Sequence, residues 1–191
     1  KTVMVDISAS GVESDNDTNS SNTNLVHNSN PTISGNGRYV AFTSDAMNLI
    51  PSGTTEGRIH VYRRDLFVGV TVLVSISHTT GLEGGASSTD ISEDPSISAD
   101  GRFVAFESNM LNLVNGYSRP LTNEFGKDIF RRDMNQDWGD HTLLVSSLDS
   151  NPLSGTPVGG SLPSGNASIS DDGSRIVFQT LSDEFGGTVD D

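Results

Sequence analysis

Oxygen-bearing side chains are the residues of this chain whose types and spacing best suit metal chemistry. Residues 13–19 read Glu-Ser-Asp-Asn-Asp-Thr-Asn, which places Asp15 and Asp17 two residues apart. Calcium accepts carboxylate, amide and carbonyl oxygens in a flexible geometry, so this segment is a candidate ligand set for an irregular Ca²⁺ site. It is not an EF-hand, because Ser20 stands where that loop requires glycine and Val26 where it requires glutamate.

A second candidate calcium site lies in the acidic tail, which contains Asp183, Glu184 and Asp190. Carboxylates that are close in sequence also occur in loops that bind nothing and only keep a protein soluble. A solvated acidic loop is therefore the alternative interpretation of both segments. Ca²⁺ is the one cofactor that the sequence suggests.

The sequence contains no arrangement that is typical of a catalytic site. Its histidines, His27, His60, His78 and His141, show no His-x-x-x-His or His-x-Glu spacing, so a metal-hydrolase motif is absent. A Gly-x-Ser-x-Gly elbow, a phosphate loop and a dinucleotide fingerprint are also missing, and the chain has no cysteine. We therefore predict that the protein is not an enzyme.

Trp138 is the single tryptophan and lies in the segment Asn-Gln-Asp-Trp-Gly-Asp at 135–140. On the surface its ring would anchor a glycan or a partner protein, whereas a ring packed on the turn would be structural. Both interpretations remain open, and Trp138 is a candidate binding residue.

The elements that must position these residues follow from a repeat. An Ile-Ser-x-x-Gly motif occurs three times and ends at Gly37, Gly101 and Gly173, which are 64 and 72 residues apart. Self-similarity at such a period indicates a repeat fold, in which each unit packs against its neighbours. A second block recurs in step with the first, at 2–8, 71–77 and 142–148.

Each repeat unit is predicted to be a four-stranded antiparallel meander. In the middle unit Asp100-Gly101 separates two strand-like segments, and this pair is a strong hairpin signal because glycine accepts the positive φ of a tight turn. Residues 103–106 are continuously apolar, as expected for a strand that is covered on both faces. With 33% hydrophobic and 6% aromatic residues, the composition also favours an all-β fold of short strands.

Two arginine pairs, Arg63-Arg64 and Arg131-Arg132, fall in corresponding strands of the first two units. Adjacent strand residues point to opposite faces, so each pair is expected to divide between two faces rather than form a basic patch. We expect these arginines to form ion pairs between units, with Asp65 or Asp133 as partners.

The segment from Asp94 to Asp133 resembles the β-propeller repeats typified by the TolB family, a WD40-like (PD40) group of bacterial repeats. The likeness rests on Pro-Ser-Ile-Ser-Ala-Asp-Gly-Arg at 95–102, Asn-Leu-Val at 112–114 and Asp-Ile-Phe at 128–130. Related copies extend it along the whole chain. The resemblance implies four-stranded blades whose first strand lines a central channel. It also implies an extracellular, periplasmic or cell-surface location, because the sequences that this segment matches best are predicted exported or envelope proteins.

The strand count predicts an incomplete propeller. Residues 1–191 are expected to form a single repeat array of about two and a half to three blades, which is too few to close a ring. Unpaired strand edges at its ends favour association, so Thr2, Val3 and Val5 are candidate assembly residues. The predicted units are a lone outer strand at 2–8, complete blades at 30–77 and 94–148, and a partial blade at 166–191.

The charge of the chain limits its partners. With 25 acidic and 11 basic side chains the net charge is -14, so nucleic acid and anionic membrane surfaces repel the protein. No apolar stretch approaches the roughly 20 residues that cross a bilayer, so a soluble protein without membrane insertion is predicted. The expected partners are other copies of the chain, the remainder of a longer propeller, or a protein or glycan ligand.

Three functional hypotheses follow from these features. The leading one is a non-catalytic extracellular or cell-envelope propeller module that binds protein, glycan or its own copies. One alternative is a calcium-stabilised subunit that polymerises through open strand edges into a filament or surface layer. The other is the accessory propeller of a secreted hydrolase.

Overall fold

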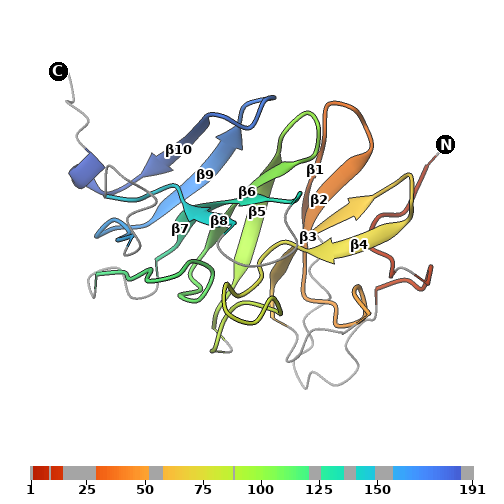
Figure 1. Cartoon of the computed structure of the whole chain (residues 1–191), viewed down its shortest axis with the longest axis horizontal. Helices are drawn as coiled ribbons and strands as arrows, with labels where there is room; N and C mark the ends of the chain where they lie inside the picture. Colours follow the sequence, from red (N-terminus) through yellow and green to blue (C-terminus); the bar gives the residue numbers. More distant parts are fainter. Residues whose placement is uncertain are drawn as a thin grey trace.

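The computed structural model describes eight segments of the chain and places three antiparallel sheets side by side (Figure 1). The first sheet, here the first unit, consists of β1 (Ser29–Ile33), β2 (Tyr39–Ser44), β3 (His60–Asp65) and β4 (Val70–Leu73), paired in that order. The segments described are residues 2–8, 10–14, 29–51, 58–87, 89–120, 126–135, 141–148 and 157–185.

The second unit repeats the first, and the third has two described strands. The second consists of β5 (Ser92–Ile97), β6 (Phe103–Ser108), β7 (Asp128–Asp133) and β8 (Thr142–Leu144), again paired in chain order. In the third unit β9 (Ser164–Ile169) pairs with β10 (Ile176–Thr180), and a single 3-10 turn follows at Asp183–Phe185. The predicted all-β architecture of four-stranded meanders is confirmed.

The first strands of the three units, β1, β5 and β9, lie next to one another. Each bends at a residue with positive φ: Asn30 at 52°, Asp94 at 49° and Asn166 at 56°. The pairing register of each strand with its neighbour also shifts close to this residue. Asn and Asp enter the left-handed region more readily than other non-glycine residues, which explains why all three units carry one of them at the bend.

The core lies within and between the sheets. Val104, Ala105 and Phe106 of β6 are fully buried, as expected from a continuously apolar strand between two layers. Aromatic pairs repeat from unit to unit, since Phe106 stacks on Phe130 with the ring centroids 5.9 Å apart and Phe42 stacks on Tyr62 at 5.8 Å. One apolar cluster joins Ala41, Val61 and Val74 of the first unit to the core of the second.

A repeated contact holds neighbouring units together at the hairpin glycines. Gly101 has a φ of 76°, and a Cβ atom at this position would overlap the ring of Tyr39 in the first unit. Arg63 lies over the same ring, 4.5 Å from its centroid, and donates a hydrogen bond of 2.6 Å to the carbonyl oxygen of Gly101. The second and third units repeat the contact with Phe103, Arg131 and Gly173. Arg131 lies 4.8 Å from the centroid of the Phe103 ring and donates a hydrogen bond of 2.9 Å to the carbonyl oxygen of Gly173.

The arginine pairs divide between two faces, as predicted, but the ion-pair partners differ from the prediction. Asp65 pairs with Arg38 of its own sheet, through Arg38 Nη2 and Asp65 Oδ2 at 2.6 Å. Arg102 and Asp133 pair in the same way at 2.7 Å. Arg63 crosses to the next unit to bind a carbonyl oxygen instead of a carboxylate. The carboxylates are already engaged by arginines that stand at the start of the preceding strand.

Residues 2–8 do not form the lone outer strand that was expected. Their only ladder pairing is an isolated antiparallel bridge between Ile7 and Glu13. The carbonyl oxygen of Ile7 accepts hydrogen bonds from Arg64 Nη1 at 2.8 Å and from Thr71 Oγ1 at 3.0 Å. The segment is held against the first unit by side chains, because none of the described strands lies beside it to supply a backbone ladder.

None of the helices found in the described residues has the length and apolar character needed to span a bilayer.

Candidate functional site

The second strand of the third unit, β10, has one open side among the described strands. In the first two units the corresponding strands, β2 and β6, pair on both sides, whereas β10 pairs with β9 alone. Val177 in this strand is 69% exposed, and Leu181 just beyond it is 74% exposed. An open strand edge presents backbone N–H and C=O groups that accept another strand.

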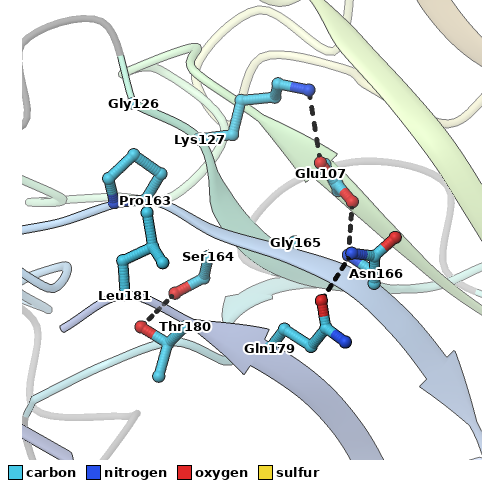
Figure 2. Close-up of a pocket in the computed structure, with 10 residues that line it drawn as sticks. All are labelled: Glu107, Gly126, Lys127, Pro163, Ser164, Gly165, Asn166, Gln179, Thr180 and Leu181. Atoms are coloured by element: carbon cyan, nitrogen blue, oxygen red, sulfur yellow. Dashed lines mark hydrogen bonds and ion pairs between the residues drawn. The ribbon is translucent and has the colours of Figure 1, made fainter. Parts of the chain in front are cut away.

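Two hollows border β10, one near each end. A groove of about 590 Å³ lies between the second and third units and includes Gln179, Thr180 and Leu181; its ten lining residues are labelled in Figure 2. A smaller hollow of about 250 Å³ lies near the start of β10, next to Ser174 and Ile176, and its other lining residues come from the second unit. A strand laid along β10 would therefore run from one hollow to the other.

Glu107 is the charged centre of the larger groove. It is only 5% exposed, and its Oε1 accepts a hydrogen bond of 2.6 Å from the backbone N–H of Asn166. Lys127 Nζ lies 3.3 Å from Glu107 Oε2 and also pairs with Glu93. Figure 2 shows the Glu107 carboxylate between Lys127 and Asn166. Burial alone lowers the pKa of Lys127, but its hydrogen bond to Glu93 and the charges of both glutamates outweigh this and raise the pKa.

The other polar groups of the groove suit hydrogen bonding rather than catalysis. Asn166 Nδ2 donates to Gln179 Oε1 at 2.8 Å, and Ser164 Oγ donates to Thr180 Oγ1 at 3.1 Å. Among the described residues, neither hydroxyl is paired with a histidine or a carboxylate that would activate it as a nucleophile. The groove offers amide and hydroxyl groups beside a strand edge, which is the chemistry that recognises a polypeptide backbone.

A cluster of three acids that sequence reasoning missed lies next to this groove. Carboxylate oxygens of Glu93, Asp94 and Glu107 lie within 4.8 Å of one another, the only such group among the described residues. The ammonium group of Lys127 pairs with two of them, and Asn30 Nδ2 donates a hydrogen bond to Asp94. The protein's own lysine therefore offsets part of their negative charge. Glu93 lies directly opposite Glu107 because the pairing register shifts between Glu93 and Ser96, and the Asp-Gly hairpin signal in the sequence does not reveal such a shift.

Two of the five predicted metal ligands, Asp183 and Glu184, lie in the part of the chain that the structure describes. Asp183 and Glu184 lie in the 3-10 turn after β10. Glu184 Oε2 accepts hydrogen bonds of 2.7 Å from Ser161 N and from Ser182 Oγ, and these bonds lower the pKa of Glu184. This carboxylate thus fastens the turn to a neighbouring loop. The remaining predicted ligands and the candidate binding residue, Asp15, Asp17, Asp190 and Trp138, lie outside the described residues.

The predicted assembly residues lie at the far end of the array from β10 (Figure 1). Thr2 is exposed and Val3 is 53% exposed. Val5 is half-buried and packs on the apolar cluster of the first unit. Their role in assembly remains a prediction.

A buried polar cluster in the first unit superficially resembles a catalytic triad. His60 Nδ1 lies 2.9 Å from Ser75 Oγ, and His60 Nε2 lies 3.4 Å from Glu83 Oε2. His60 and Ser75 are completely buried, and Ser75 Oγ also accepts the backbone N–H of Val61. Burial lowers the pKa of His60 to about 4, and Glu83 offsets only part of this effect. None of these side chains lines either hollow, so the cluster joins β3 to the strand segment after it and is structural.

No protein-family model and no curated protein sequence matches the chain. The four-stranded antiparallel meanders of the first two units are β-propeller blades. Among solved structures, a protein described as TolB from Agrobacterium tumefaciens shows 15% identity and a TM-score of 0.43 over 84% of this chain and 40% of that one.

Two peptidase structures show a similar likeness. The β-propeller domain of the Trilobed protease from Pyrococcus furiosus, which is described as having an open velcro topology, shows 12% identity and a TM-score of 0.41 over 81% of this chain and 34% of that one. A prolyl endopeptidase shows 14% identity and a TM-score of 0.42 over 82% of this chain and 19% of that one. The chain therefore spans less than half the length of each of these proteins.

Proposed function

We propose that this chain is a non-catalytic β-propeller module whose strand β10 accepts a further strand, either from the remainder of a longer propeller or from another polypeptide. The observation that carries the proposal is the open side of β10, which is bordered by a hollow at each end. Strand addition uses backbone hydrogen bonds for affinity and the hollows for side-chain selectivity. The corresponding positions in the other units are occupied by β3 and β7, each with six paired residues on this side.

The chemistry of the groove favours a polypeptide over a glycan. Sugar-binding sites rely on aromatic faces, whereas none of the ten lining residues of the groove is aromatic. The exposed Val177 and Leu181 offer apolar contact to alternate side chains of an added strand. A protein ligand, either another polypeptide segment or a second copy of this chain, therefore fits the site better than a carbohydrate.

We further propose that the module works outside the cytoplasm, in the periplasm, at the cell surface or in the medium. This part of the proposal is supported by the resemblance of residues 94–133 to exported and envelope repeat proteins. The net charge of -14 is compatible with such a protein, because it keeps an array with open strand edges soluble.

Hydrogen–deuterium exchange of the 191-residue chain tests strand addition. The probe is a synthetic peptide with the sequence of residues 59–66, which includes β3, at concentrations up to about 1 mM. We expect it to slow exchange at residues 174–181, because their open backbone groups become paired, and to leave β2 and β6 unchanged. The control peptide has proline at its two central positions and therefore cannot complete a ladder. Unchanged exchange throughout β10 at the highest concentration would exclude the proposed function.

A further inference from the structure

We infer that Asn115 is a site of spontaneous chemical modification, at which the side-chain amide is converted into a carboxylate, in part as isoaspartate. The inference goes beyond the proposed function and does not depend on it. It concerns the connection between β6 and β7 in the second unit (Figure 1). It is drawn from the different surroundings of the two Asn-Gly pairs of the chain, Asn36-Gly37 and Asn115-Gly116.

The reaction needs an asparagine, the backbone nitrogen of the next residue and water. The backbone nitrogen of Gly116 loses its proton and attacks Cγ of Asn115, which forms a five-membered imide ring and releases ammonia. Water then opens the ring. Cleavage of the new N–Cγ bond gives aspartate, whereas cleavage of the original peptide bond gives isoaspartate, in which the backbone runs through Cβ and Cγ. Glycine favours ring formation because it has no side chain to obstruct the approach and its backbone rotates freely.

Asn115 and Gly116 occupy the two central positions of an exposed β-turn. A hydrogen bond of 3.3 Å from Tyr117 N to Val114 O closes the turn. Gly116 has a φ of 67°, as the third position of a type II turn requires. Both residues are exposed, and within the described part of the chain neither the Asn115 amide nor the Gly116 N–H has a hydrogen-bond partner. The attacking nitrogen and the attacked carbon are therefore free to approach each other, and water reaches both.

The other pair, Asn36-Gly37, is held by four hydrogen bonds. Asn36 Oδ1 accepts from Ser34 Oγ at 2.7 Å and from Arg38 N at 2.9 Å. Asn36 Nδ2 donates to the carbonyl oxygen of Asp100 in the second unit at 3.4 Å. The nitrogen that would attack, Gly37 N, donates to Ser34 O at 2.8 Å. These bonds must break before the imide ring forms, so the same dipeptide is protected in the first unit and unprotected in the second.

The neighbouring asparagines of the same connection are also engaged. Asn109 Oδ1 accepts a hydrogen bond from Ile91 N, and Asn112 Oδ1 accepts one from Gly85 N, both at 2.7 Å. Each of these asparagines is followed by a large apolar residue instead of glycine. The reaction is therefore expected at Asn115 and not at the other two.

Isoaspartate at position 115 would disturb a buried contact directly after the turn. Tyr117 is 7% exposed, and its hydroxyl donates to Asp128 Oδ2 at 2.6 Å. Its ring meets Phe130 edge-on, with the centroids 5.4 Å apart. On the other side of the turn Val114 is buried in the same apolar cluster. Isoaspartate adds one atom to the backbone of a turn whose two ends are packed in the core, so both ends cannot keep their places.

The displaced contact supports a completely buried carboxylate. Burial raises the pKa of Asp128, and the hydrogen bonds from Tyr117 and Ser146 counteract this effect. Without Tyr117, Asp128 keeps the bond of 2.7 Å from Ser146 Oγ, but Oδ2 loses its hydroxyl donor. Loss of a hydrogen bond at a buried charged group is costly, so the isoaspartyl form should be less stable than the original chain.

Peptide mapping after incubation at physiological temperature and mildly alkaline pH tests the site. Trypsin releases Asn115 in the peptide 103–127, because the bond between Arg119 and Pro120 resists cleavage, and Asn36 in the peptide 2–38. Tandem mass spectrometry then locates the acid that replaces the amide. We expect Asn115 of the folded 191-residue chain to react at least about tenfold faster than Asn36, whose hydrogen bonds must break first. In concentrated urea both pairs should react at similar rates.

Two variants assign the product to its residue. Asn115→Gln should remove the modified form of the peptide 103–127, because glutamine would have to form a less favourable six-membered ring. Asn36→Gln is the matched control and should leave that product unchanged. Equal rates at the two sites of the folded chain, or reaction of Asn115 only in urea, would overturn the inference. Either outcome leaves the proposed function as it stands.

Urea unfolding tests the effect on Tyr117. The incubated chain should unfold at a lower urea concentration than Asn115→Gln incubated in parallel. Fresh Asn115→Asp carries the new charge without the longer backbone, and it should unfold like the fresh unaltered chain. If the incubated chain is as stable as incubated Asn115→Gln, the effect on the Tyr117 contact is refuted. An equal loss in fresh Asn115→Asp would refute it too, because charge alone would then explain the change.

Discussion

The hairpin glycine of the first unit occupies a different environment from those of the second and third units, although the sequence motif is the same. Gly101 and Gly173 each lie against an aromatic ring of the preceding unit, where a Cβ atom has no room. Gly37 has a φ of 69°, close to the 76° of Gly101, but a Cβ atom there would have no neighbour within 4 Å. The difference arises because none of the described sheets precedes the first unit. In the first unit the glycine therefore only allows the turn. In the second unit it allows both the turn and the close contact between units.

Alanine substitutions at these two glycines should separate the two roles. Gly37→Ala should lower the free energy of unfolding by about 1 kcal/mol, the cost of placing a side chain at positive φ. Gly101→Ala should cost about 3 kcal/mol, because the added methyl group also displaces the Tyr39 ring from its place under Arg63. Urea denaturation followed by circular dichroism measures both. Equal losses in the two variants would show that the ring contact contributes nothing to stability.

At the scale of single strands, the second unit contains an unfavourable pairing that a third strand corrects. Glu93 of β5 and Glu107 of β6 lie directly opposite each other, and like charges on one rung destabilise a sheet. Lys127, which immediately precedes β7, contributes the compensating charge to both. Glu107 in turn binds the backbone of β9 through Asn166 N. The lysine thus stabilises the sheet and, through Glu107, the contact with the third unit.

Removing the lysine should expose the repulsion. Lys127→Met keeps the length of the side chain, and we expect it to lower the free energy of unfolding by about 1–2 kcal/mol at neutral pH. The double variant Lys127→Met/Glu93→Gln should recover most of this loss, because the remaining glutamate no longer faces a like charge. Lys127→Arg is the control and should remain close to the unaltered protein. A double variant no more stable than Lys127→Met alone would show that repulsion between the glutamates is not the cause.

At the scale of the whole molecule, the repeat period and the Asn-Gly and Asp-Gly hairpins were sufficient to predict an all-β array of four-stranded meanders. The contacts between units were harder to predict. Arg63 donates to the carbonyl oxygen of Gly101, which is 38 positions away in the sequence. Side-chain types do not predict such a contact, because every residue has a backbone carbonyl group.

Stability in such an array should decrease toward the unit that has the fewest partners. In a repeat protein each unit is stabilised mainly by its nearest neighbours, and among the described strands β10 lacks both a sheet partner on its open side and a following unit. Residues 104–108 of β6 are at most 5% exposed, whereas Val177 of β10 is 69% exposed. Native-state hydrogen exchange at neutral pH should therefore be about 100-fold faster or more in β9 and β10 than in β6 and β7, with β2 and β3 as the internal reference. Equal protection in all three sheets would instead mean that the chain opens as one cooperative body and that the third unit draws its full stability from the second.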